Sequence, residues 1–165
     1  MKTFNSKGQA IAVDLVIATI IFAIIVFTLL GIGEENVGAI NEKVELNEIH
    51  SRAEGALMQL VEGNGNPENW EGIPAAQVQE IGLAEKRLEV DEKKLNALKN
   101  FGYDGARTLL EINPYDFFFD VNALSGEYVF AGLPPIADAT IVSIKRAVTY
   151  KGGEAVATIK VYRAK

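Results

Sequence analysis

Cysteine is absent from the chain, and histidine and tryptophan occur only once each, as His50 and Trp70. Without cysteine, neither disulfide bonds nor thiolate metal sites can hold a domain together, so the burial of apolar side chains must do so. A single histidine cannot form a metal-binding cluster, and the hydroxyl side chains have no evident base. We therefore predict no catalytic residues, no metal site and no cofactor, and a protein that is not an enzyme.

Basic residues are in the minority, with 16 Lys and Arg against 22 Asp and Glu, which gives a net charge of −6. Proteins that bind nucleic acids neutralise phosphates with an excess of lysine and arginine. The charge balance therefore excludes nucleic acid as an expected partner.

One long apolar run is present, residues 10–33, and its 24 residues carry a single charge, Asp14. As a helix it would be roughly 36 Å long, which exceeds the hydrocarbon thickness of a bilayer, about 30 Å. Lys2 and Lys7 precede the run, and acidic residues follow it from Glu34. Because basic residues stay on the cytoplasmic side, we expect the amino end inside and the rest of the chain outside.

The helical pattern continues beyond the run. No proline interrupts residues 34–62, and apolar residues recur there at helical spacing. Glycine, asparagine and proline in residues 63–67 then end the helix. We predict one long helix over residues 9–62, with a membrane or core part at 9–33, followed by a head domain at 63–165. Whether the helix bends between Gly31 and Gly38 stays open.

The head combines short helices with strands. Asp91 is the predicted N-cap of a short helix, in which the lysines form a solvated face. Alternating apolar residues predict a strand at 115–121 and a shorter one at 127–131. The fold class expected from these elements is α+β: a long N-terminal hydrophobic helix and a small outer domain with an antiparallel sheet of three or four strands.

The sheet is predicted to close with a hairpin over residues 142–163. A two-residue turn at Gly152 and Gly153 would place Val148 opposite Ala157 and Lys145 opposite Lys160. In that register one face is nearly all apolar, so Val148 should be buried.

Lys7, Gly8 and Gln9 stand directly before the apolar run. This placement resembles the class III signal peptide of archaeal type IV pilin-like proteins. The resemblance implies that a prepilin peptidase removes residues 1–8 by cutting between Gly8 and Gln9. It also implies that residues 9–33 anchor the precursor in the membrane and later pack in the core of a filament.

Asp14 extends the resemblance. The family usually carries a carboxylate five positions into the mature chain, where it pairs with the free amine of a neighbouring subunit. Asp14 is the sixth residue counted from Gln9, and a cut after Gln9 would restore the usual spacing, so both cut sites remain open. The residues alone also allow an interfacial acid in the first turn, favoured by the helix dipole.

The resemblance implies a structural subunit of an archaeal type IV pilus-like surface filament, a pilin that serves adhesion. The precursor would have a cytoplasmic amino end, and the filament would be extracellular, at the cell surface. The expected partners are further copies of the chain, a prepilin peptidase and, before assembly, the membrane. The residues expected in the filament core are Ile11, Leu15, Ile20, Phe22, Ile25, Phe27 and Leu30. The alternative is a single-pass, membrane-tethered extracellular binding module that does not polymerise.

Overall fold

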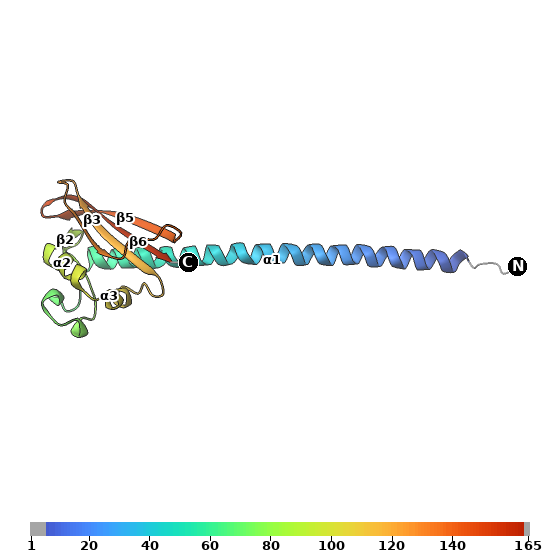
Figure 1. Cartoon of the computed structure of the whole chain (residues 1–165), viewed down its shortest axis with the longest axis horizontal. Helices are drawn as coiled ribbons and strands as arrows, with labels where there is room; N and C mark the ends of the chain where they lie inside the picture. The colour runs from blue at the N-terminus through green and yellow to red at the C-terminus, as the bar shows by residue number, and fades with distance from the viewer. Residues whose placement is uncertain (1–5, 164–165) are drawn as a thin grey trace. The chain divides into compact units, whose positions relative to one another are not determined.

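The computed structural model describes the backbone of residues 6–163 and the side chains of residues 15–28 and 43–163. The chain divides into two compact units, residues 1–45 and 46–165. Helix α1 (Ser6–Glu62) has 57 residues, so its first part belongs to the first unit and its last turns to the second (Figure 1). No proline interrupts it, and it ends where Gly63 donates a last backbone hydrogen bond to Gln59.

The second unit continues with short elements. Two single 3-10 turns, η1 (Trp70–Gly72) and η2 (Ala75–Gln77), precede the first strands. The remaining elements are β1 (Ala84–Lys86), β2 (Glu89–Val90), α2 (Glu92–Asn100), α3 (Tyr103–Leu109), β3 (Asp116–Ala123), β4 (Tyr128–Gly132), β5 (Thr140–Tyr150) and β6 (Gly153–Arg163).

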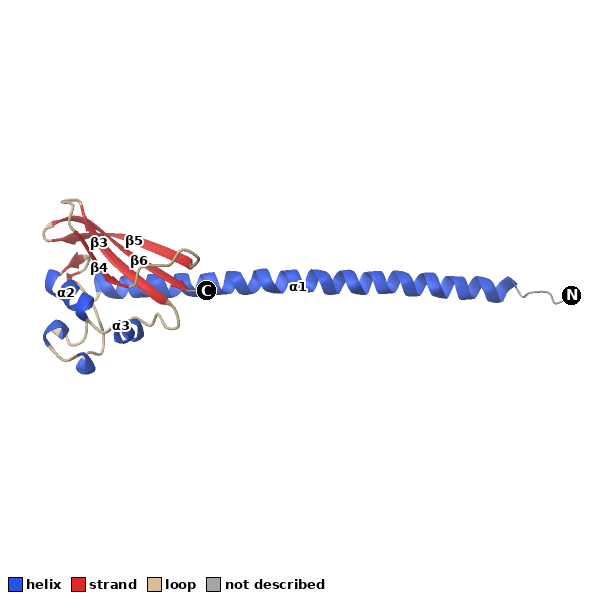
Figure 2. Cartoon of the chain, viewed as in Figure 1, coloured by secondary structure: helices blue, strands red, loops and turns tan. Residues whose placement is uncertain are grey.

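The six strands form one sheet in the order β1-β2-β5-β6-β3-β4. Neighbouring strands are antiparallel except β2 and β5, which are parallel. Figure 2 shows this sheet alongside the last turns of α1. The core lies between them, because α1 presents an apolar stripe at helical spacing to the inner face of the sheet. The largest fully buried side chains of this contact are Ile49, Leu57, Leu60, Phe117, Phe119 and Ile159.

Helix α2 begins as the sequence predicts. The carboxylate of Asp91 accepts hydrogen bonds from the backbone N–H groups of Lys93 (2.6 Å) and Lys94 (3.0 Å), which confirms the N-cap. The prediction that the lysines of this helix form a solvated face is wrong for Lys94, whose side chain is buried. Its ammonium group donates to the carbonyl oxygens of Asn64 (2.8 Å) and Ala84 (3.3 Å), so it connects the segment that follows α1 to β1.

The closing hairpin has the predicted buried face in a different register. Val148 is buried as expected, but it lies opposite Ala155 rather than Ala157, and Lys145 lies opposite Thr158 rather than Lys160. The turn residues are Lys151 and Gly152, with φ of 51° and 73°. Positive φ at both positions is what a type I′ turn requires. A register shift of two residues leaves each side chain on the same face of the sheet. The predicted buried face is therefore confirmed, although the predicted residue pairs are wrong.

The expected fold class is corrected in two respects. The sheet has six strands, not three or four, because β1 and β2 have three and two residues and show no alternation that a sequence could reveal. The expected long hydrophobic helix is also wrong: among the residues that the structure describes, no helix is long and apolar enough to cross a membrane. Helix α1 is long, but its later turns mix charged residues with the stripe that packs on the sheet.

Candidate functional site

The first unit carries a dense apolar surface on α1. Nine large apolar side chains between residues 15 and 27 are exposed, from 49% for Ile17 to 75% for Phe27. Because successive residues of a helix are about 100° apart, these positions point to all sides of the helix. A helix that is apolar all round is normally covered by other apolar groups. We call residues 15–28 the apolar surface of α1.

The polar groups of this segment are satisfied within the helix. The hydroxyl of Thr19 donates to the carbonyl oxygen of Leu15 (2.8 Å), and that of Thr28 donates to Ile24 (2.7 Å). Such back-bonding leaves neither threonine in need of water or an outside partner. The segment therefore offers neighbours apolar groups only.

The predicted site residues fall into two groups. Leu15, Ile20, Phe22, Ile25 and Phe27 all lie on the apolar surface of α1, and each is at least half exposed. The others fall outside the residues whose side chains are described: Gly8, Gln9, Ile11, Asp14 and Leu30.

Sequence reasoning did not single out four further members of this surface: Val16, Ile17, Ile21 and Ile24. The sequence pattern could have indicated them, because apolar residues of the run lie on all sides of the helix and not along one stripe.

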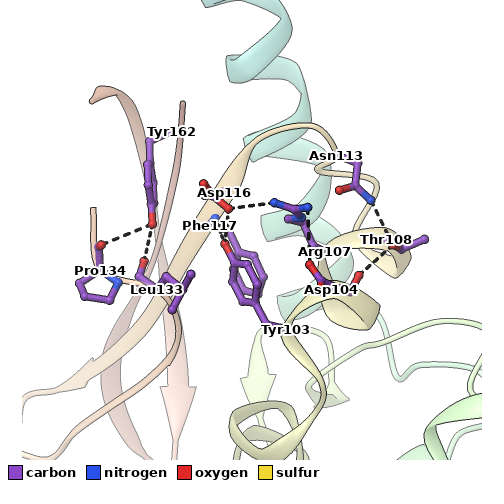
Figure 3. Close-up of polar contacts among 10 residues, drawn as sticks. All are labelled: Tyr103, Asp104, Arg107, Thr108, Asn113, Asp116, Phe117, Leu133, Pro134 and Tyr162. Carbon is purple, nitrogen blue, oxygen red and sulfur yellow. Dashed lines mark hydrogen bonds and ion pairs between the residues drawn. The ribbon is translucent and has the colours of Figure 1, made fainter. Parts of the chain in front are cut away.

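A polar cluster in the second unit joins α3 to β3 (Figure 3). The Tyr103 hydroxyl donates to a carboxylate oxygen of Asp116 (2.8 Å), Arg107 donates to the same oxygen (2.9 Å), and the Phe117 N–H donates to the Tyr103 hydroxyl (3.1 Å). Burial raises the pKa of the Tyr103 phenol, and the neighbouring Asp116 raises it further. A phenol held in its protonated form serves as a structural donor here.

A second cluster fixes the hairpin turn. The Lys151 ammonium group lies 2.7 Å from a carboxylate oxygen of Glu92 and 2.8 Å from one of Glu127. The hydrogen bond to Glu127 and, to a smaller extent, the one to Glu92 raise the pKa of Lys151 above its ordinary value. These groups are largely in solvent, so the cluster contributes orientation more than stability.

Among the described residues, the hollow beside α1 in the second unit does not combine catalytic groups. A hollow of about 540 Å³ beside α1 is lined by Glu48, Ser51, Arg52, Gln59 and Glu111, among others, and by no histidine. Arg52 is engaged there with Glu48 and with the carbonyl oxygen of Glu111. In the described part of the chain, no three His, Cys, Asp or Glu side chains come together as a metal site would require.

No protein-family model, curated protein or solved structure matches this chain. Its function must therefore be argued from its own residues, and the apolar surface of α1 is the feature that most needs a partner.

Proposed function

We propose that the chain is a structural subunit of a pilus-like surface filament on an archaeal cell, in which copies associate through the apolar surface of α1. The observation that carries the proposal is the exposure of nine large apolar side chains on all sides of one helical segment. Covering half-exposed side chains of this size contributes on the order of 10 kcal/mol per subunit. Identical helices in a bundle can supply that cover, and a contact between different faces builds a helical filament when its rotation does not close into a ring.

The sequence before this surface supports the same proposal. Lys7, Gly8 and Gln9 precede the apolar run, as in the leaders that prepilin peptidases remove. Removal of the leader would create a free amine at Gln9 or Ala10, and Asp14 of a neighbouring copy is its proposed partner. A buried carboxylate needs such a partner, because an unpaired charge in an apolar environment is costly.

The proposal predicts that assembly depends on the apolar surface of α1 and not on the exposed apolar residues of the head. Phe22→Gln, placed in the parent's own cells, should strongly reduce filaments seen by electron microscopy, because it introduces an amide that must be desolvated in the bundle. The matched control is Leu124→Gln, which changes a similarly exposed side chain of the second unit, 77% against 68% for Phe22, and should leave filaments intact. Neither residue belongs to the core, so both variants should retain a folded head.

The amino-terminal residue of the protein from its own cell surface, read by mass spectrometry, completes the test. We expect Gln9, with Ala10 as the second choice. An intact Met1, filaments as abundant with Phe22→Gln as with the parent, or a parent found only as isolated monomers would overturn the proposal. The last result would favour the tethered binding module.

A further inference from the structure

Strand β5 has one paired and one open edge. Along its whole length it pairs with β6, but on the other side only Thr149 and Tyr150 pair, with the two residues of β2. Within residues 6–163 no other strand lies against this side, so the segment 140–148 is an open edge. The edge is open because the chain turns between β1 and β2, where Leu88 adopts a φ of 65° and donates its N–H to Val61.

The backbone groups of this edge are available. The N–H of Thr149 donates to the carbonyl oxygen of Leu88 (2.7 Å), so Thr149 points away from β6. Since the backbone groups of alternate residues in an antiparallel ladder point to the same side, those of Ser143, Lys145 and Ala147 also point away from β6. An edge of this kind is a template for an added strand.

The side chains of the open edge have a defined chemistry. Val142 and Ile144 are half-buried on the inner face, next to the core. Lys145 and Arg146 follow on opposite faces, and neither forms an ion pair within the described part of the chain. The Nε atom of Arg146 is buried and has no hydrogen-bond partner there. The Nε atom of Arg146 therefore lacks an acceptor, and Lys145 has no direct ion pair but attracts the carboxyl group of Asp120 at longer range.

One end of the open edge meets a hollow of about 440 Å³. Its lining is mostly apolar and includes Leu88, Leu124, Ala147 and Val156. A strand added along β5 would pass this hollow, and an apolar side chain at its end could enter it.

We propose that the open edge of β5 binds an extended, acidic segment of a partner protein by strand addition. The segment would place apolar side chains beside Val142 and Ile144 and two consecutive carboxylates beside Lys145 and Arg146. Charge complementarity selects this occupant over a second copy of the chain, because two β5 edges would bring four cationic side chains together. The proposal does not depend on filament formation.

The test uses the full chain in a mild non-ionic detergent, which covers the apolar surface of α1. The probe is the peptide Thr-Glu-Glu-Val-Thr-Ile-Val, designed to lie antiparallel to β5 with its two acids opposite Arg146 and Lys145. The control peptide carries two lysines in place of the two glutamates. We expect about tenfold weaker binding of the control by isothermal titration calorimetry, since two favourable charge pairs become unfavourable.

Amide hydrogen exchange, measured residue by residue by NMR, locates the bound peptide. The acidic peptide should slow exchange at Ser143, Lys145 and Ala147, whose N–H groups are free, and change little at Ile144 and Arg146, which are already bonded to β6.

Two variants separate strand addition from general attraction. Ser143→Pro removes one outward donor and leaves the β6 ladder intact, so it should abolish peptide binding, while Ser143→Ala should not. The double variant Lys145→Glu with Arg146→Glu should prefer the control peptide, and it decides the question even if the proline variant does not fold.

Three results would overturn the proposal. Equal binding of both peptides would remove the role of charge. Unchanged exchange at Ser143 and Lys145 with bound peptide would place the contact elsewhere. Self-association of the chain that slows the same amides without peptide would make a second copy the occupant.

Discussion

Replacing Val148 by aspartate tests the face assignment of the closing hairpin most directly. Val148 is only 7% exposed, lies opposite Ala155 on the inner face of the sheet and belongs to the core. Its neighbour Ala147 is exposed on the outer face, opposite Val156. The two positions are adjacent in the same strand, so Ala147→Asp is a matched control for the intrinsic cost of aspartate in a strand.

The expected cost of Val148→Asp follows from two terms. Losing a buried valine side chain costs about 1.5–3 kcal/mol. Burying a carboxyl group without a partner adds about 1–3 kcal/mol even when it is protonated, so the total is about 4 kcal/mol. For a unit of this size that corresponds to a fall in Tm of roughly 12 °C or more. Ala147→Asp should cost less than about 1 kcal/mol, the range of strand propensities.

The pH dependence of Val148→Asp provides a second readout. Burial raises the folded-state pKa of the introduced carboxyl group above its unfolded value, about 3.9. The folded state then holds the proton more tightly, so the destabilisation is complete above the folded-state pKa and decreases as the pH falls toward 4.

Thermal unfolding of the full chain in detergent, followed by the fluorescence of the single buried tryptophan, Trp70, measures these effects. Equal Tm values for Val148→Asp and Ala147→Asp would refute the burial argument. So would a difference between the two variants that does not shrink at low pH.

Two further predictions concern the second unit. Tyr103→Phe should destabilise it by about 1–2 kcal/mol, because the N–H of Phe117 loses its acceptor. The raised pKa of Tyr103 makes the parent lose stability as the pH rises above 10, so the variant should lose less stability over that range in urea titrations at alkaline pH. Gly82→Ala should lower the free energy of unfolding by about 3 kcal/mol, since a Cβ would collide with the carbonyl oxygen of Gly63, whereas Gly55→Ala, in open space on α1, should raise it by about 0.5–1 kcal/mol. Calorimetric Tm values that move in the same direction for both variants would contradict this reasoning.

Local signals in the sequence were sufficient for some elements of the head. The N-cap at Asp91 depends on residues within one turn, and the strand around Phe117 and Phe119 could be predicted from the residue types of that one segment. The pairing of β2 with β5 depends on contacts between residues about 60 positions apart, and β2 has only two residues. No periodicity can appear in so short a strand, which explains why the sheet was predicted with too few strands.

The hairpin register shows a different limit. Two adjacent glycines suggested the turn, because glycine adopts positive φ without strain. The structure instead places Lys151 at a φ of 51°, where its ammonium group reaches Glu92 and Glu127. These ion pairs with Glu92 and Glu127, in two other segments of the chain, accompany that conformation. A prediction from the turn residues alone does not take such contacts into account.

The candidate sites divide in the same way. The apolar surface of α1 could be read from composition alone, because residues 15–28 are apolar except for Thr19 and Thr28 and no folding pattern is needed to see it. The open edge of β5 could not, because an edge exists only once the order of strands is known, and here it is created by a turn at Leu88 in a distant segment. The same difference makes the two proposals separable by experiment. Phe22→Gln acts on a surface outside the head core, and Ser143→Pro acts on a backbone group outside the β6 ladder, so each should impair one association and leave the other unchanged.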